Sequence, residues 1–262
     1  MPTAAGETPS DTLHWSGLLS DEEWTLYRRV LKPMTAQGLL FAVGGGFAFS
    51  YHSRHWRNTK DLDLYILPQD RPRAVELLER AGFKDLYPAK PYDRAWIYRG
   101  TREEVIVDLI WAMANQRAQV DEDWLKRGPE SEIHDLPLRI LPVEELIWAK
   151  LYAVQRDRCD WPDLLNILYI QGPALNWVHL LGRVDDDTRL LGGLLSLFCW
   201  MCPAEAAKLP AWIWEPLGLH APAAPGHDET ALHRVALLDR RDWFGPTHAN
   251  DNGGTAQQKP GT

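Results

Sequence analysis

The sequence predicts a mixed α/β (α+β) fold, with a mixed sheet flanked by helices and a helical C-terminal half. Short apolar segments alternate with helix-like segments over residues 36–141, which is typical of a sheet with helices packed on it. From Pro142 to about Leu217, apolar residues recur at helical spacing. The chain has 262 residues, of which 45% are hydrophobic, so it can build one large core or two modest cores.

We expect four parts along the chain. Residues 1–12 are small and polar and predict a flexible lead, and residues 13–141 form the α/β domain. Residues 142–220 form a helical domain. Residues 221–262 are rich in Ala, Pro and Gly and predict an irregular, disordered tail.

Individual elements follow from local patterns. Residues 13–35 predict one or two helices, and Ser20 with Glu23 three positions later has the spacing of a capping box. Gln69–Ala81 predicts a helix that stops at Gly82. The strand candidates are Leu39–Val43, Asp61–Leu67, Phe83–Tyr87, Ala95–Arg99, Val105–Trp111 and Leu138–Leu141.

Two aspartates open the second of these strands. Side chains alternate faces along a strand, so Asp61 and Asp63 point the same way while Leu62 and Leu64 point into a core. Adjacent carboxylates repel each other, and a hard cation such as Mg²⁺, which prefers oxygen ligands, would relieve the repulsion. The pair therefore favours a metal site, although a solvated strand start would account for it as well.

A third carboxylate lies in the strand Val105–Trp111. Asp108 is the one charge inside this strand, which is otherwise apolar on both faces. A buried aspartate needs a metal, a base or an opening to water. Beside Asp61 and Asp63 it would complete a site for two metal ions, the arrangement used for phosphoryl or nucleotidyl transfer. A strand-end cap is the alternative role for Asp108.

Three glycines, residues 44–46, connect the first strand to a short helix. Such a turn lets a ligand approach the backbone, and N–H groups at a helix N-terminus favour anions. The sequence contains neither a Walker-type Gly-Lys-Ser/Thr nor a Gly-x-Gly-x-x-Gly of the dinucleotide-binding type. The glycines come fifteen residues before the aspartate pair, with Arg57 and Lys60 just ahead of it.

This order of motifs resembles the nucleotidyltransferase superfamily that includes DNA polymerase β. Residues 38–112 carry the likeness, and it is closest to AbiE-type toxins and to uncharacterised bacterial nucleotidyltransferases. The resemblance implies that Gly45 and Gly46 contact a triphosphate and that Asp61 and Asp63 hold the metals. It also implies that Asp108 is a third metal ligand that helps to activate the acceptor.

A second likeness lies in the predicted helix that begins at Pro142. Lys150 interrupts an apolar stripe of this helix, either because it faces nucleotide phosphates, as in the toxins, or because its head snorkels to water. The resemblance also extends to Asp160 and Asp163, which match an Asp-x-x-Asp pattern with accessory residues near the active site. Asp160 precedes Trp-Pro and could instead serve as a helix N-cap.

Charge and cysteine usage narrow the class of protein. The formal net charge is −8, and a protein that grips nucleic acid over a long footprint usually has a basic face. Three cysteines do not make a disulfide framework, and no segment is long and apolar enough to predict a membrane span or a signal peptide. We therefore expect a cytoplasmic protein.

The resulting prediction is an enzyme that transfers a nucleoside monophosphate from an NTP to an acceptor hydroxyl, with Mg²⁺ or Mn²⁺ as cofactor. Arg57, Lys60 and Lys150 would neutralise phosphate charge. The acceptor is either RNA, in particular tRNA, or a small hydroxylated molecule such as an aminoglycoside or lincosamide. The resemblance to toxins also implies an antitoxin partner. A non-catalytic nucleotide- or partner-binding module on the same fold is the alternative from another class.

Overall fold

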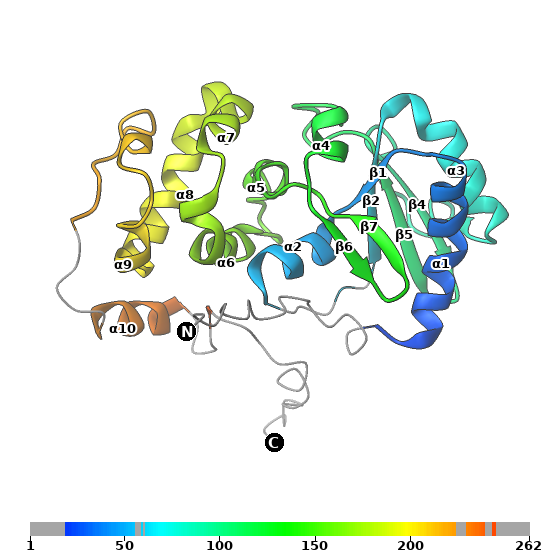
Figure 1. Ribbon diagram of the computed structural model, residues 1–262, viewed down its shortest axis with the longest axis horizontal. Helices are drawn as coiled ribbons and strands as arrows, with labels where there is room; N and C mark the ends of the chain where they lie inside the picture. Colours follow the sequence, from blue (N-terminus) through cyan, green and yellow to red (C-terminus); the bar gives the residue numbers. More distant parts are fainter. Residues whose placement is uncertain (1–18, 56–58, 60, 224–228, 239–242, 245–262) are drawn as a thin grey trace, which may run out of the picture.

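The structure is a computed structural model, and it describes residues 19–55, 59, 61–223, 229–238 and 243–244 (Figure 1). A five-stranded mixed sheet occupies one half of the molecule, and helices make up the other half. The predicted fold class is confirmed. No helix in the described part of the chain is both long enough and apolar enough to cross a membrane.

The sheet has the strand order β1-β2-β5-β4-β3. Its central pair, β2 and β5, is parallel, and the other neighbours are antiparallel. The strands are β1 (Phe41–Val43), β2 (Asp61–Ile66), β3 (Lys84–Asp85), β4 (Ile97–Arg102) and β5 (Val105–Ile110). The predicted strands for these segments are thus confirmed, with ends that differ by a few residues, as is usual at strand boundaries.

Two helices cover one face of the sheet. Helix α1 (Asp21–Ala36) begins at Ser20, whose side chain forms the predicted capping box with Glu23. A 3₁₀ turn, Pro68–Asp70, leads into α3 (Arg71–Arg80), so the helix predicted from Gln69 begins slightly later. On this face Leu62, Leu64 and Val107 are almost completely buried. This alternation of buried residues forms the core and leaves the other side chains of β2 and β5 for the opposite face.

The opposite face meets α2 (Gly45–Ser53) and the helical half of the molecule. That half comprises α5 (Val143–Leu151), α6 (Trp161–Gln171), α7 (Trp177–Val184), α8 (Thr188–Met201) and α9 (Pro203–Ala206). Helix α6 packs on both α2 and α5. The helical half therefore forms the second wall of the space in front of the sheet.

Three features differ from the predictions. The segment predicted as a strand at Leu138–Leu141 forms β7 (Leu136–Arg139), which pairs in a separate two-stranded sheet with β6 (Glu130–Ile133). Strand β6 is largely polar, so hydrophobic patterning did not reveal it. The short helix α4 (Glu122–Lys126) precedes this hairpin.

One helix forms within the C-terminal segment that was predicted to be irregular. Helix α10 (Glu229–Leu238) forms within residues 221–262 and packs against α8, so the predicted irregular character does not apply to these ten residues. Composition concealed it because the Pro- and Gly-rich stretches on either side dominate the segment average. The predicted lead, residues 1–12, lies outside the described residues.

Candidate active site

Three carboxylates converge on the face of the sheet opposite α1 and α3. Strands β2 and β5 run parallel with Asp63 directly opposite Asp108, and Asp61 lies two residues before Asp63 on the same face. One ligand atom from each of the three lies within 4.8 Å of the others. The prediction that these side chains come together is confirmed. Asp108 is almost fully buried, with 1% of its surface exposed, whereas Asp61 and Asp63 are half-buried.

The glycine turn lies directly against this cluster. Gly44 is the N-cap of α2, and its N–H donates to the Asp63 carbonyl oxygen at 2.9 Å. Gly45 has a φ of +51°, and a Cβ at this position would lie 1.6 Å from Asp63 Oδ2. A side chain at Gly46 would meet the Thr59 hydroxyl at 2.7 Å. The glycines thus allow the N-terminus of α2, where anions are favoured, to contact the carboxylates.

Arg99 on β4 is a cation in direct contact with the cluster. It is the register partner of Asp108, and its Nε donates to both carboxylate oxygens of Asp108, at 2.9 and 3.0 Å. Its Nη2 donates to Asp108 Oδ2 at 2.7 Å and lies 3.4 Å from Asp61 Oδ2. The guanidinium therefore fixes the orientation of Asp108 and provides part of the charge balance that buried carboxylates require.

The electrostatics are those of an incompletely compensated acidic cluster. Burial is the main reason that the pKa of the Asp63 carboxyl rises to about 8, and the charges of Asp61 and Asp108 add to it. Burial also raises the pKa of Asp108, against the opposing hydrogen bonds from Arg99. The charges of Lys150 and Arg99 oppose the rise at Asp63 without cancelling it, and a divalent ion bound by the carboxylate oxygens would stabilise their charged forms further.

The cluster lies in a cavity of about 980 Å³ between the sheet and the helical half. Gly45, Gly46 and Lys150 line it together with the three aspartates, as the sequence analysis expected. The cavity has room for a ligand of the size of a nucleotide, because small-molecule pockets span roughly 300–1,000 Å³. Its other lining includes side chains from the loop between α5 and α6 and from the segment before β4.

Lys150, near the end of α5, holds two aspartates of the next helix. Its Nζ donates to Asp160 Oδ2 at 2.8 Å and to Asp163 Oδ2 at 2.7 Å, and all three side chains are at least nine-tenths buried. The alternative in which the lysine snorkels to water is therefore wrong, because its ammonium group lies between carboxylates. Whether it also contacts a nucleotide stays a prediction.

Asp160 is the N-cap residue of α6 by position, but its side chain makes no capping hydrogen bond. Its carboxylate instead accepts from Lys150 and, through both oxygens, from Nε and Nη2 of Arg158 at 2.9 Å each. Burial alone would raise the pKa of Asp160, but the hydrogen bonds from Arg158 and the charge of Lys150 hold it at about 2. The capping role considered for Asp160 is thus not the one its carboxylate performs.

Two of the predicted phosphate-binding residues, Arg57 and Lys60, lie outside the described residues. Two cavity-lining cations were missed by sequence reasoning, Arg99 and Arg158. The signal for Arg99 was its position in a predicted strand, where a charge requires a partner. The resemblance had drawn attention to the region of Arg158 without selecting that residue.

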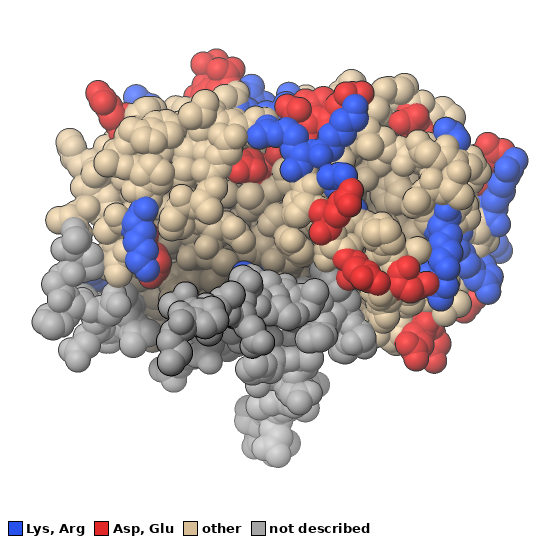
Figure 2. All heavy atoms as spheres, in the orientation of Figure 1, with Lys and Arg blue, Asp and Glu red and all other residues tan. Residues whose placement is uncertain are grey.

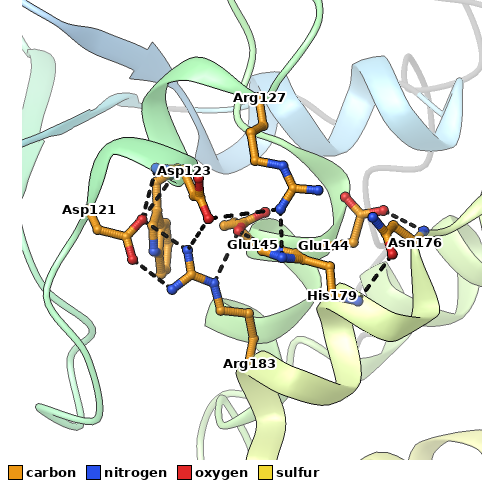
Figure 3. A network of polar contacts seen from close by, with 9 residues as sticks. Asp121, Asp123, Arg127, Glu144, Glu145, Asn176, His179 and Arg183 are labelled. Atoms are coloured by element: carbon orange, nitrogen blue, oxygen red, sulfur yellow. Dashed lines mark hydrogen bonds and ion pairs between the residues drawn. The ribbon is translucent and has the colours of Figure 1, made fainter.

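A polar network joins the segment around α4 to α5 and α7 of the helical half (Figure 3). Arg183 of α7 donates to both oxygens of Asp121, at 2.6 and 2.9 Å, and to Glu145 of α5 at 3.3 Å. His179 Nε2 lies 2.6 Å from the same Glu145 oxygen, and Arg127 lies 2.6 Å from His179 Nδ1. This α4–α5–α7 network fixes the helix that carries Lys150.

Comparison with known proteins assigns the chain to a family. The family model described as uncharacterised nucleotidyltransferase matches residues 27–184, which include every described residue of the site. No curated protein sequence matches the chain. The match does not distinguish AbiE-type toxins from other nucleotidyltransferases, so that part of the resemblance stays a prediction.

Three of the solved structures to which the chain is similar have low sequence identity and TM-scores below 0.5. The antibiotic-resistance factor ANT(2'')-Ia is 18% identical with a TM-score of 0.46, covering 68% of this chain and 97% of its own. The lincosamide antibiotic adenylyltransferase LnuA, bound to lincomycin, is 17% identical with a TM-score of 0.42. The match covers 58% of this chain and 98% of LnuA. JHP933 from Helicobacter pylori is 16% identical with a TM-score of 0.35. The match covers 68% of this chain and 79% of JHP933.

At these TM-scores the three structures say nothing about the acceptor of this chain. The family match alone covers more than half of the residues, and it includes the glycine turn, the three carboxylates and Lys150. The chain therefore belongs to the family of uncharacterised nucleotidyltransferases and is a transferase of that class.

Proposed function

We propose that the protein transfers a nucleoside monophosphate from an NTP to an acceptor hydroxyl in a reaction that depends on Mg²⁺ or Mn²⁺. The observation that carries this proposal is the convergence of Asp61, Asp63 and Asp108 beside a helix N-terminus with no room for side chains. Carboxylate oxygens suit hard divalent cations, and helix N-termini suit phosphates. A cytoplasmic location, where NTPs are available, is part of the proposal.

The residues fit a divalent metal. The three carboxylates supply oxygen ligands that lie within 4.8 Å of one another, and burial together with the charges of Asp61 and Asp108 raises the pKa of Asp63, which a bound cation would lower again. Asp61 and Asp63 would hold the metal, with Asp108 as the third ligand. A bound divalent ion would neutralise phosphate charge and orient the reacting groups.

The chain's own groups would perform the remaining tasks. The N–H groups at Gly45 and Gly46 bind the triphosphate, and Lys150 neutralises part of its charge, with Arg57 and Lys60 in the same role. The acceptor oxygen forms a bond to the α-phosphorus, the bond to pyrophosphate breaks, and Asp108 accepts the hydroxyl proton. Arg99 keeps Asp108 oriented for this step because it binds both carboxylate oxygens.

A small hydroxylated molecule is the second candidate acceptor. It is favoured by the half-buried aromatic side chains Tyr92 and Trp96, which line the cavity beside β4 and offer flat apolar surfaces to a sugar or ring system. An antitoxin partner belongs to the toxin form of the proposal, in which the acceptor is RNA.

The direct test is transfer of label from α-³²P NTPs to total tRNA or to a panel of aminoglycosides and lincosamides, with and without Mg²⁺. The wild type should label one acceptor class only when metal is present. Asp63→Asn should abolish labelling, while the exposed control Asp186→Asn should not affect it. Transfer that persists in Asp63→Asn would refute the assigned site.

Metal binding can be measured without any acceptor. Millimolar Mg²⁺ should raise the melting temperature, because a ligand that binds only the native state stabilises it. Asp63→Asn should lose most of this shift, and Asp186→Asn should retain it. An unchanged melting curve with Mg²⁺, with and without NTP, would count against the site.

A further inference from the structure

A basic hollow lies on the other face of the sheet. It has a volume of about 610 Å³ and lies between α1 and the end of α3. Figure 2 shows lysine and arginine side chains gathered at this end of the molecule, over α1 and α3. The cations that line the hollow are Arg28, Arg29, Lys32, Arg80 and Arg102.

Arg102 is anchored by the backbone next to the hollow. Arg102, at the end of β4, donates from Nη1 to the Ala81 carbonyl oxygen at 2.7 Å, directly after α3. Gly82 makes this possible, because a Cβ there would lie 2.6 Å from the same nitrogen. Arg102 is therefore held in place before any ligand arrives, which lowers the entropic cost of binding an anion.

The rim carries the uncompensated charge. Asp135 pairs with Arg28 and Lys32 together, so one carboxylate serves two cations. Arg80 pairs with Glu76, and Arg102 with Glu103. Within the described part of the chain, Arg29 forms no ion pair, and its side chain is exposed. Five cations thus face three acids, in a chain whose formal net charge is −8.

The hollow and the carboxylate cluster lie at the same end of the sheet on opposite faces. In the strand register, Asp61 of β2 is paired with Ile106 of β5. Ile106 is in turn paired with Thr101 of β4, the residue before Arg102. Neighbouring strands are about 4.8 Å apart, so the backbones of Asp61 and Arg102 are roughly 10 Å apart across β5. A long, flexible ligand that passes around this end of the sheet can contact both.

We propose that the basic hollow binds the phosphate backbone of an RNA whose hydroxyl enters the cavity as the acceptor. This inference rests on the proposed function and selects RNA between its two acceptor classes. Arg28 and Lys32 lie one turn apart along the surface of α1, so the site presents a row of cations to successive phosphates. The negative net charge of the chain does not oppose this, because salt screens charges beyond about 10 Å.

The experiment measures RNA affinity by fluorescence anisotropy with labelled total tRNA, over a range of KCl concentrations and without NTP. In Arg29→Ala/Lys32→Ala, the dissociation constant should rise about tenfold at low salt, because two phosphate contacts are lost. The slope of log affinity against log salt should become shallower by about 1.5. The matched control is Lys126→Ala/Lys208→Ala, which removes two exposed lysines elsewhere with the same change of net charge.

Equal weakening by both double variants would overturn the inference, because the bulk field and not the hollow would then attract RNA. Unchanged affinity in the Arg29/Lys32 variant, or no binding of tRNA by the wild type at low salt, would overturn it as well. With turnover, the variant should raise KM for RNA while leaving kcat and NTP affinity unchanged. Loss of transfer in Asp63→Asn tests the proposed function separately, since RNA binding needs neither metal nor NTP.

Discussion

Lys150→Met separates the structural role of this lysine from its role toward a nucleotide. The substitution keeps an unbranched apolar stem and removes the charge. In the structure, that charge lies 2.8 Å from Asp160 and 2.7 Å from Asp163. A lysine that faced phosphates or snorkelled to water, the two roles considered from the sequence, would lose little stability in this substitution. The buried contacts lead to the opposite expectation.

The magnitude follows from what remains after the substitution. Asp160 keeps Arg158, whose own side chain is 64% exposed, and Asp163 loses its lysine. Removing one partner of a buried ion pair costs about 3–5 kcal/mol, because the remaining charge stays buried with less compensation. We expect a loss at the lower end of this range, since Arg158 still neutralises part of the cluster. This is a large fraction of the 5–15 kcal/mol that typically stabilises a domain.

Urea unfolding, followed by circular dichroism and linear extrapolation, measures the loss. The triple variant Lys150→Met/Asp160→Asn/Asp163→Asn is the matched control, because it removes the positive and the negative charges together and should recover much of the stability. Titration calorimetry with NTP on the same proteins tests whether Lys150 contacts the nucleotide. If it does, Lys150→Met should lose roughly 1.5–3 kcal/mol of NTP binding free energy. A free energy of unfolding that stays within about 0.5 kcal/mol of the wild type would refute the reasoning.

Three further predictions concern single positions. Gly45→Ala should abolish the Mg²⁺-induced rise in melting temperature, because its Cβ would lie 1.6 Å from Asp63 Oδ2. Gly38→Ala is the control, because Gly38 has a φ of +66° and open space around it. This variant should keep the rise and lose only about 1–2 kcal/mol of stability to backbone strain. The pKa of Asp160 lies at about 2, below the ordinary 3.8. The stabilisation that this carboxylate contributes is therefore complete above about pH 4 and is lost as the pH falls through about 2. The free energy of unfolding should consequently depend less on pH in Asp160→Asn when acid unfolding is measured. Glu145→Gln should lower stability by about 1.5–3 kcal/mol in urea unfolding, because it removes the charge that accepts hydrogen bonds from two donors; an unchanged midpoint would contradict this role.

Much of the site could be predicted because it follows from alternation along strands. The two-residue period placed Asp61 and Asp63 on one face, and a single charge in an apolar strand identified Asp108. The pairing of Arg99 could not be predicted, because it depends on the register of the β4–β5 hairpin. That register is set by a two-residue turn in which Glu103 and Glu104 have φ of 51° and 68°. Such turns usually carry Asn-Gly or Asp-Gly, so two glutamates give no signal for one.

The acid partners of Lys150 were hidden for a related reason. They lie ten and thirteen residues further along the chain, beyond a loop that folds back on itself, with Val154 bridged to Cys159 and the Asp160 N–H bonded to the Ala153 carbonyl oxygen. Helical periodicity identifies which face of one helix is apolar, but it does not say which neighbouring helix lies opposite. The resemblance pointed to these aspartates without indicating that they bind the lysine.

The α4–α5–α7 network also determines which tautomer His179 adopts. Arg127 has only donors to offer, so the Nδ1 that it contacts must be the lone-pair nitrogen, and the single ring proton sits on Nε2, facing Glu145. The hydrogen bonds therefore run in one direction, from α4 through α7 to α5. Imidazole ¹⁵N shifts of His179 distinguish the two ring nitrogens, and they give a spectroscopic reporter of whether the two halves of the enzyme are docked.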